Sequence, residues 1–443
     1  MTLRLREGGP GLALEVLDSR TADPIVRERW RTIIAHRSAA LQASLGLRVH
    51  PLQLEEDTDG PVLRVHGIAG TLRLGTVELD VAPKHQEDLT DDRWRAALLA
   101  MIERAERRRA SHHVSERLQL GGVTFADHVA FTYAIALEQA LRKAPIRMYE
   151  SRQEHTPVLR GRLLVSEQLR SSLTTPHLLV CEVDRLNDDN PINRLLQWAG
   201  QRLLSLATNG AVRRSLSHHL SRIPGVTTAR VPILRRGALP RQFAHYGQAV
   251  EIASAVARAT GAALGGAHRR AGGGFAIGTE KLFELVVQHS LAIAAHDRPW
   301  TVSPQVSGPF ADPVAPNPGA RFNSKPDNLV QAAGCRLVVD AKYKRFEDAT
   351  EASRGSRPTN ADLYQMAAAA IAHRCDRALL VYPKMAATDT AAETEIRWWS
   401  IKGWTTDTLR VGVCSVDLQA IGGPGGIGTL DRRLAALVDE AIA

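Results

Sequence analysis

The sequence predicts a multidomain protein of the α+β and α/β classes, with a small β-rich N-terminal module, a helical middle region and a C-terminal α/β core. The chain has 443 residues, which at ~150 residues per domain suggests two or three domains. Hydrophobic residues make up 44% and charged residues 23%, so the chain can bury a core. Apolar residues change from a period of two to helical spacing near residue 90, and strands alternate with helices after residue 279.

Residues 1–90 are expected to form short strands separated by turns. Leu63–Ile68 alternates apolar and polar residues, and a second run, TLRLGTVELDV, covers residues 71–81. Pro83 closes this second strand because its ring removes a hydrogen-bond donor from the ladder. These runs predict a small module built mainly of β-structure.

Residues 91–260 are predicted to be mostly helical. Leu98, Leu99 and Ile102 fall at helical spacing, and the hydroxyl and acidic residues just before this region suit a helix N-terminus. Further helices are expected at residues 125–143, 191–203 and about 245–263, with one short strand at 160–165.

A glycine-rich stretch at residues 261–278 is expected to be a flexible linker. No strand leads into it and no Gly-Lys-Ser/Thr sequence ends it, so a phosphate-loop interpretation fails. Residues 279–443 then follow an α/β pattern. The expected elements are helices at 279–295, 361–374 and from 431 onward, strands at 327–331, 337–343, 377–382, 398–401 and 411–416, and a loop at 304–320.

Composition excludes several classes of protein. No apolar run is long enough for a transmembrane helix, and the first residues lack the apolar core of a signal peptide. The four cysteines form no Cys-x-x-Cys pair, which argues against a disulfide framework or zinc knuckle and favours a cytoplasmic location. The net charge of +9 suggests a polyanionic partner without establishing one, and 5% aromatic residues argue against a single-strand binder.

The most informative segment for chemistry contains two acidic residues and a lysine. Asp327 follows a proline, twelve residues intervene, and then Asp340-Ala341-Lys342 follows an apolar run. In a strand, Asp340 and Lys342 point to the same face because they are two residues apart. The pattern therefore predicts a carboxylate and an ammonium at one end of a buried strand, with a second carboxylate on the neighbouring strand.

Phosphodiester hydrolysis uses this combination of groups. Carboxylates hold Mg²⁺ while leaving positions for water, the main-chain carbonyl of Ala341 offers another oxygen, and a lysine orients water or stabilises charge on phosphorus. An isolated Asp-x-Lys is usually an exposed ion pair, so the preceding strand and the spaced Pro-Asp carry the hypothesis. Glu280 and Glu284 share a helix face and add to it, although such pairs are often only solvated charges.

The order of helix-borne Glu, Pro-Asp, Asp-x-Lys and a helix with Tyr-Gln resembles the PD-(D/E)XK nuclease superfamily. More narrowly, the chain resembles the McrC family, the nuclease subunits of McrBC modification-dependent restriction systems. The matching set spans about residues 60–385 in the family's order. The matching stretches are Leu79–Lys84, Leu159–Leu163, Asn190–Leu196, Thr279–Glu284, Lys325–Asp327, Val339–Lys344 and Asp362–Met366.

The resemblance implies a role for each matching residue and a Mg²⁺ or Mn²⁺ cofactor. The implied site residues are Asp327 and Asp340 as metal ligands, Lys342 as the catalytic lysine, Glu284 as the acid assisting the metal site, and Gln365, with Tyr364, near the scissile phosphate. The family's partner is an AAA+ nucleotide hydrolase ring, McrB, that holds the N-terminal region of McrC in its pore. Residues 1–260 would then bind the partner, and residues 279–443 would form the nuclease.

Three hypotheses follow for function. The first is a Mg²⁺-dependent endonuclease subunit that cuts double-stranded DNA, with modified or otherwise marked DNA as the candidate target, when its ring partner activates it. The second is an activator and scaffold for the ring in which cleavage is secondary or absent, because over half of the chain lies outside the nuclease motif. The third is a stand-alone restriction-like nuclease. The target base, the use of GTP or ATP by the partner and the stoichiometry stay open.

Overall fold

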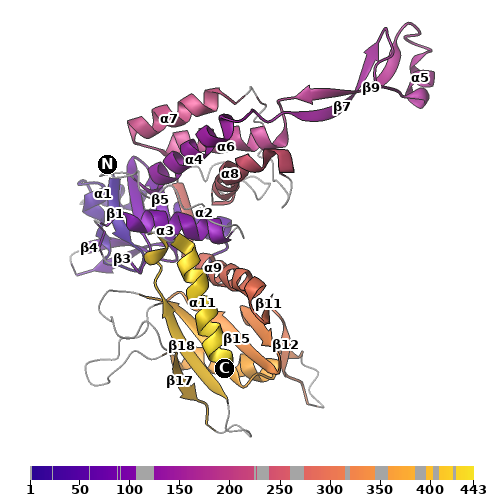
Figure 1. Cartoon of the computed structure of the whole chain (residues 1–443). Helices are drawn as coiled ribbons and strands as arrows, with labels where there is room; N and C mark the ends of the chain where they lie inside the picture. The colour runs from indigo at the N-terminus through magenta and orange to yellow at the C-terminus, as the bar shows by residue number, and fades with distance from the viewer. Residues whose placement is uncertain are drawn as a thin grey trace. The chain divides into compact units, whose positions relative to one another are not determined.

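The computed structural model divides the chain into two compact units, one of which is inserted in the sequence of the other (Figure 1). The first unit combines Met1–His128 with Gly266–Ala443, and the second is Val129–Arg258. The structure describes residues 2–21, 23–58, 60–86, 88–89, 91–105, 124–223, 226, 239–259, 274–314, 320–344, 358–384, 396–402, 409–422 and 426–443.

Two small sheets form the N-terminal part of the first unit. Their strands are β1 (Thr2–Arg6), β2 (Leu12–Ala13), β3 (Leu52–Asp57), β4 (Gly60–Val65), β5 (Ile68–Leu74), β6 (Val77–Ala82) and β10 (Gly274–Gly278). The larger sheet has the order β1-β6-β5-β10, with β1 parallel to β6, and the smaller has the order β2-β4-β3. Strand β6 ends just before Pro83, as predicted, whereas the predicted run Leu63–Ile68 is split by a turn at Gly67, whose φ is 67°.

The prediction of short strands separated by turns in residues 1–90 omits a long helix, α2 (Pro24–Leu45), which is preceded by the short α1 (Leu14–Leu17). The Asp23 side chain caps α2 by accepting from the N–H of Ile25, and Gly46 ends it in the left-handed conformation. The buried residues Trp30, Ile34, Ser38 and Leu41 recur at helical spacing and form the face that packs on the sheets. The capping residues and the helical spacing of the buried residues could therefore have predicted this helix from the sequence.

The linker prediction also needs correction at its end. Residues 261–273 lie outside the described part of the chain, but Gly274–Gly278 forms β10 and pairs antiparallel with β5. Gly70 permits this pairing, since a Cβ there would lie 2.2 Å from the carbonyl oxygen of Phe275. Phe275 is fully buried, and its ring centroid lies 5.4 Å from that of Phe125. Burial of this aromatic residue explains why a glycine-rich segment becomes a strand.

Helix α3 (Arg93–Ala105) belongs to the first unit, although the sequence analysis grouped it with the middle region. Its Arg95 forms a buried ion pair with Asp80 of β6. Asp80 also accepts hydrogen bonds from the N–H of Phe125, at 3.0 Å, and from the hydroxyl of Thr71, at 3.1 Å. These bonds tie α3 and the start of α4 (Phe125–Leu141) to the N-terminal sheet.

A six-stranded sheet forms the C-terminal part of the first unit, in the order β11-β14-β15-β16-β18-β17. Its strands are β11 (Trp300–Pro304), β14 (Asn328–Ala332), β15 (Cys335–Ala341), β16 (Arg377–Pro383), β17 (Arg397–Ser400) and β18 (Arg410–Val416). Strands β15, β16 and β18 are parallel, and the other three run antiparallel to their neighbours. The five strands predicted in this region are thus present within a few residues of the expected positions.

Helices cover both faces of this sheet (Figure 1). Helix α10 (Asn360–His373) packs Met366 against Val338 and Leu380 on one face. Helices α9 (Thr279–Ala294) and α11 (Gly426–Ile442) contact each other and β15, and lie on the opposite face. The helix predicted from residue 431 begins at Gly426, and part of the predicted loop 304–320 pairs as β12 (Gly308–Ala311) with β13 (Phe322–Ser324). Short 3₁₀ turns at Ala295–Asp297 (η3) and Ala420–Gly422 (η4) complete this half.

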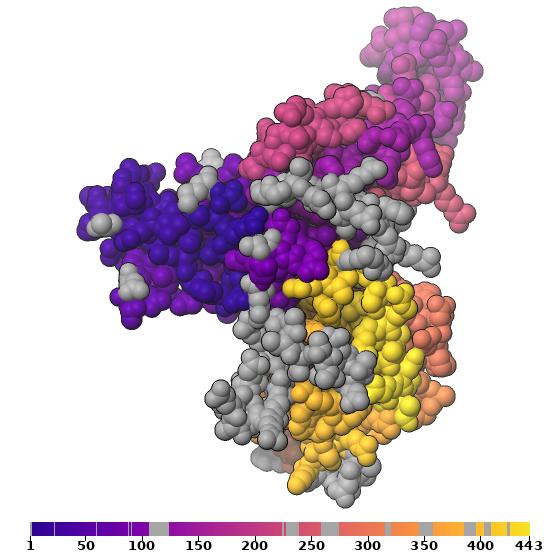
Figure 2. All heavy atoms as spheres, turned by 60° about the vertical axis from the view of Figure 1, so that its left-hand side comes forward, coloured from indigo at the N-terminus to yellow at the C-terminus, as the bar shows by residue number. Residues whose placement is uncertain are grey.

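The second unit consists of a helical body and a projecting β-arm (Figure 1). The body contains the rest of α4, α6 (Pro191–Leu206), α7 (Gly210–Ser221), η1 (Arg241–Tyr246) and α8 (Gly247–Ala259). The arm contains β7 (Met148–Thr156), β8 (Arg162–Leu163), α5 (Val165–Ser171) and β9 (Leu179–Asn187), with the order β7-β9-β8. Figure 2 shows the end of the arm as a separate knob of side chains.

The prediction of a mostly helical middle region misses most of this arm. Strand β7 has the sequence MYESRQEHT, in which most side chains are exposed on both faces, so no apolar alternation marks it. The helix predictions in this region hold, with α4, α6 and α8 near the expected positions. None of the helices in the described part of the chain is long and apolar enough to cross a membrane.

Candidate functional site

The predicted Asp327 and Asp340 lie side by side at the carboxyl end of β15. Strand β14 begins directly after Asp327 and runs antiparallel to β15, which places its start beside the end of β15. The N–H of Ala341 donates to Asp327 Oδ2 at 2.9 Å, and the N–H of Asp327 approaches Asp340 Oδ1 at 3.4 Å. The hairpin between these strands therefore brings together two carboxylates that twelve intervening residues separate in the sequence.

Lys342 completes this group from the same strand end. Its ammonium lies 2.7 Å from Asp340 Oδ2, and the two side chains are 21% and 4% exposed. The N–H of Lys342 donates to the carbonyl of Val381 on β16, so the backbone that carries the lysine is held by the sheet. The sequence prediction that Asp340 and Lys342 share a face agrees with this ion pair.

Helix α9 places Glu284 near Asp327, and an unpredicted residue connects the two. The side-chain amide of Gln305 donates to Glu284 Oε1 at 2.9 Å and to Asp327 Oδ1 at 3.2 Å. Glu284 also pairs with Lys281, one turn earlier on α9. Glu280 is exposed on the same helix. No motif marked Gln305 in the sequence, because a single glutamine after a strand has no distinctive pattern.

Burial and the neighbouring carboxylates change the ionisation of Asp327. Burial raises the pKa of Asp327 to about 7, and the charges of Asp340 and Glu284 contribute in the same direction. The N–H of Ala341 and the ammonium of Lys342 oppose this effect without cancelling it. Near neutral pH this carboxyl group therefore lies close to its ionisation midpoint, and a cation would favour its charged form.

The donors at this strand end fit a hard divalent cation better than a soft metal. No group of three or more His, Cys, Asp or Glu side chains in the described part of the chain is arranged to hold a metal ion. Mg²⁺, however, is commonly bound through only one or two carboxylates and keeps several waters. Asp340 Oδ2 is buried and forms an ion pair with the ammonium of Lys342, and no other described residue donates a hydrogen bond to it. Asp327 and Asp340 therefore offer oxygen atoms suited to Mg²⁺ or Mn²⁺.

A second polar cluster lies next to Lys342 and was not predicted. Asp362 of α10 is buried and lies 2.6 Å from the ammonium of Lys344, and it accepts hydrogen bonds from the hydroxyls of Tyr382, at 2.8 Å, and Thr359, at 2.9 Å. Burial acts to raise the pKa of Asp362, but these contacts outweigh it and lower the pKa below its ordinary value. Asp362 therefore stays ionised and anchors α10 to the strand end beyond Lys342.

The predicted Gln365 and Tyr364 lie on the outer surface of α10. Both side chains are exposed, that of Tyr364 by 72%. Neither forms a hydrogen bond with Asp327, Asp340 or Lys342 in the described part of the chain. The structure thus groups the three motif residues with Glu284 and leaves the Tyr-Gln pair facing solvent.

The end of β6, where Pro83 and Lys84 follow the strand, contacts the segment that follows β15. The Lys84 ammonium donates to the carbonyl oxygen of Tyr343 and lies 4.1 Å from the centroid of its ring. His85 is buried, with Nδ1 3.4 Å from the Tyr343 hydroxyl. Because Tyr343 directly follows Lys342, the N-terminal module supports the backbone of the predicted catalytic lysine.

A buried glutamate extends this junction to α9. Glu7 accepts hydrogen bonds from the hydroxyl of Thr279, at 2.8 Å, from the N–H of Gly67, at 3.1 Å, and from the N–H of Lys84, at 3.4 Å. Burial raises its pKa, and the nearby Lys84 partly offsets that effect. Since Thr279 is the first residue of α9, Glu7 connects the N-terminal module to the helix that carries Glu284.

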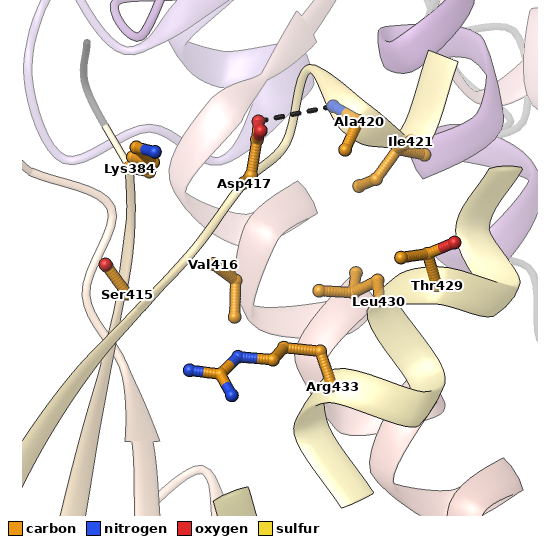
Figure 3. A pocket seen from close by; sticks show the side chains of 9 residues that line it. All are labelled: Lys384, Ser415, Val416, Asp417, Ala420, Ile421, Thr429, Leu430 and Arg433. Atoms are coloured by element: carbon orange, nitrogen blue, oxygen red, sulfur yellow. Dashed lines mark hydrogen bonds between the residues drawn. The ribbon is translucent and has the colours of Figure 1, made fainter. Parts of the chain in front are cut away.

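A separate pocket of about 300 Å³ opens between the ends of β16 and β18 and the start of α11 (Figure 3). Figure 3 shows Asp417 accepting the N–H of Ala420 at its rim, a bond of 3.2 Å. None of the predicted site residues lines this pocket. Its lining residues are Lys384, Ser415, Val416, Asp417, Ala420, Ile421, Thr429, Leu430 and Arg433.

The family model of the McrBC 5-methylcytosine restriction system component matches residues 63–383 of the chain. The chain belongs to this family. The match includes Lys84, Glu284, Gln305 and the motif from Asp327 to Lys342. It therefore covers both Lys84 of the N-terminal module and the segment that follows β15, which Lys84 contacts. The resemblance to McrBC systems predicted from the sequence motifs is confirmed.

The chain is similar to chains of two solved structures. A chain of the assembly of Thermococcus gammatolerans McrB AAA+ hexamers with bound McrC aligns with a TM-score of 0.63 at 16% identity, covering 99% of this chain and 100% of that chain. A chain of the cryo-EM structure of the Thermococcus gammatolerans McrBC complex aligns with a TM-score of 0.44 at 19% identity, covering 67% and 88%. The first likeness supports the mixed α and β fold. No curated protein matches the chain.

Proposed function

We propose that this member of the McrBC family is a Mg²⁺- or Mn²⁺-dependent endonuclease that cuts double-stranded DNA, with a PD-(D/E)XK core in residues 279–443. The observation that carries the proposal is the meeting of Asp327, Asp340 and Lys342 at the end of one strand. Membership of a 5-methylcytosine restriction family supports it, and modified DNA is the expected target. We place the activity in the cytoplasm, where the four free cysteines stay reduced.

Each residue of the group has a distinct role in this proposal. Asp327 and Asp340 would hold the cation, and the main-chain carbonyl of Ala341 would be a further oxygen ligand. The cation supplies a Lewis acid that lowers the pKa of water and offsets negative charge on the phosphate. Lys342, held at 2.7 Å by Asp340, directs its ammonium toward the same place, where it orients water and stabilises the charge that develops on phosphorus.

The DNA backbone would approach this strand end from the side of α10. Lys342 and Lys344 both lie there, and the exposed Gln365 and Tyr364 face outward on α10, within a chain of net charge +9. Lysines near a phosphate chain lower the free energy of binding through release of counterions. We propose that Gln365, with Tyr364, contacts the DNA backbone beside the scissile phosphate.

We propose an AAA+ ring of the McrB type as the partner, bound through residues 1–260. McrC is bound to McrB AAA+ hexamers in the structurally similar Thermococcus gammatolerans assembly. In the second unit of this chain, the arm exposes a group of large apolar side chains, as a contact surface for another protein does. They are Val158, Leu159, Val165, Leu169 and Leu173, exposed by 60%, 60%, 61%, 69% and 88%.

The arm also supports the second candidate, an activator and scaffold of the ring in which cleavage is secondary or absent. None of the predicted site residues belongs to the second unit, which still forms a compact body with an exposed apolar arm. In this case the wild-type chain would not cut DNA. The Asp340→Ala chain would still stimulate the partner's nucleotide hydrolysis. A stand-alone nuclease would instead cut DNA without the ring.

A cleavage assay separates these functions. Wild type and Lys342→Ala are compared on methylated and unmethylated duplex with Mg²⁺, with and without the ring partner and its nucleotide. We expect wild type to cut only with the ring, and Lys342→Ala to lose ~10³-fold or more in rate, since it removes stabilisation of the transition state. Nucleotide hydrolysis by the ring should be stimulated equally by both. Equal cleavage rates for wild type and Lys342→Ala would contradict the proposed role of Lys342 in cleavage.

A further inference from the structure

Gln305 joins the acidic elements of the candidate site. Its side-chain Nε2 donates to Glu284 on α9 at 2.9 Å and to Asp327 at 3.2 Å. Its main-chain N–H donates to the carbonyl oxygen of Asp327 at 3.0 Å. One residue therefore holds both the backbone and the side chain of Asp327 and connects them to the helix that carries Glu284.

The backbone of Gln305 is strained. Its φ is 53°, in the left-handed region that residues with a Cβ rarely adopt, and Arg374 is its only non-glycine counterpart in the described part of the chain. This conformation is unfavourable for an L-residue, whereas glycine adopts it freely. Three hydrogen bonds to Asp327 and Glu284 stabilise Gln305 in this conformation. Strained residues of this kind cluster at functional sites.

The side-chain amide of Gln305 suits a cation site, which must keep its negative charge. Because the amide is neutral, it donates to two carboxylates without cancelling the charge that attracts a cation. Its bonds fall on Oε1 of Glu284 and Oδ1 of Asp327, while Asp327 Oδ2 accepts from the N–H of Ala341. Among the described residues, each side-chain oxygen of Asp327 therefore has one donor, which fixes the rotation of the carboxylate while leaving further lone pairs on each oxygen.

We propose that Gln305 is a positioning residue for the divalent-cation site, setting the orientation of Asp327 and its separation from Glu284 before the cation arrives. The inference rests on the proposed function, because it assigns Gln305 to the same site. Residues that hold metal ligands in place typically account for roughly 10- to 100-fold in metal affinity. Gln305 acts through Asp327 and Glu284 and touches neither cation nor substrate in this scheme.

The test is Gln305→Gly in the full chain, with Mn²⁺ affinity measured by calorimetric titration and thermal stability measured in a chelator. We expect the Kd for Mn²⁺ to rise roughly 10- to 100-fold. The Tm should stay the same or rise, because glycine relieves the backbone strain. Gln305→Asn keeps an amide on a shorter side chain and should fall between wild type and Gln305→Gly in affinity. A merely structural residue would lower the Tm and leave the affinity unchanged.

Arg374→Gly is the matched control. Arg374 has a φ of 54° at the C-terminal cap of α10, where its N–H donates to the carbonyls of Ala370 and Ile371. Glycine there relieves the same kind of strain away from Glu284 and Asp327. We expect Arg374→Gly to match wild type in Mn²⁺ affinity.

The outcomes separate this inference from the proposed function. If Gln305→Gly binds Mn²⁺ as tightly as wild type, the positioning role is wrong, while a wild-type chain that binds Mn²⁺ and cuts DNA keeps the nuclease proposal. If Arg374→Gly weakens Mn²⁺ binding as much as Gln305→Gly, general backbone effects explain the loss and the inference fails. A wild-type chain that neither binds Mn²⁺ nor cuts DNA overturns both proposals.

Discussion

At the scale of single residues, the carboxyl group of Asp327 is partly buried, so that water screens its negative charge poorly. Its folded-state pKa of about 7 lies above the ordinary value of 3.8, chiefly because of burial, so the folded protein binds this proton more tightly than the unfolded chain. The protonated form of Asp327 therefore contributes to the stability of the fold. This contribution is fully present below about pH 4 and is lost as the pH rises to about 7. Above that pH, the ionised carboxylate destabilises the fold unless a cation is bound.

The substitution Asp327→Asn tests this balance between stability and function. In a chelator at pH 8, we expect Asp327→Asn to be more stable than wild type by roughly 1–2 kcal/mol, because it removes a buried, repelled charge. At pH 4 the gain should vanish, since wild-type Asp327 is then protonated. The Tm at each pH, with and without Mg²⁺, gives the measurement. A gain that does not change with pH would contradict the account, as would Mg²⁺ stabilising both proteins equally.

The site residues differ in how far the sequence predicts them. Asp327, Asp340 and Lys342 were predictable because strand periodicity and spacing fix their relative positions. Glu284 was predictable only through the resemblance, since a helical carboxylate is otherwise a common solvated residue. Gln305 was not predictable, because its role comes from contacts across the fold and from a backbone angle that no residue pattern encodes.

At the scale of elements, the ends of two strands from different parts of the chain meet next to the candidate site around Lys342. Strand β6 leads into Lys84, and β15 leads into Lys342 and Tyr343. Lys84 donates to the Tyr343 carbonyl, and Glu7 links the same place to the start of α9. The position of the predicted catalytic lysine therefore depends on the N-terminal module as well as on its own sheet.

The substitution Lys84→Ala should slow cleavage by about 10-fold, because loss of a well-placed bond to the Tyr343 carbonyl loosens the strand end that carries Lys342 and costs roughly 1 kcal/mol or more. Single-turnover cleavage with the ring partner gives the rate, and Lys84→Arg should recover part of it. The exposed Lys402 provides the control, Lys402→Ala, which should cut at the wild-type rate. If Lys84→Ala lowers the Tm while the folded protein cuts normally, the junction serves folding alone.

The elements that the sequence missed share a physical cause. Strand β10 is rich in glycine and forms because Phe275 is buried against Phe125, a partner distant in the sequence. The arm strand β7 is polar on both faces, so alternation cannot reveal it. The strands of the six-stranded sheet were predictable because helices cover both of its faces, which requires continuous apolar runs such as Leu337–Val339.

At the scale of the whole molecule, the two units divide the proposed tasks. The predicted site residues lie in the first unit, and the exposed apolar arm belongs to the second. We expect the double substitution Leu169→Ser with Leu173→Ser to weaken binding to the ring by at least ~10-fold, since exposed leucines contribute at an interface through burial. The Tm should not change, because both side chains are exposed by 69% and 88%.

The measurements are the affinity for the ring and the stimulation of its nucleotide hydrolysis. Val314→Ser is the control, because Val314 is 79% exposed in the first unit. Wild-type affinity in the arm variant would show that the ring is held elsewhere in residues 1–260. A loss of Mn²⁺ binding in the arm variant would contradict the division of tasks.

The pairing of β5 with β10 sets an order of events during protein synthesis. Strand β5 leaves the ribosome early, but its partner, Gly274–Gly278, emerges only after the whole of the second unit. Until then the edge of β5 is unpaired and Phe125 lacks the ring of Phe275, so the N-terminal sheet cannot be completed. The inserted unit can therefore fold first, and the first unit is completed only when the strands and helices of its C-terminal part have been translated.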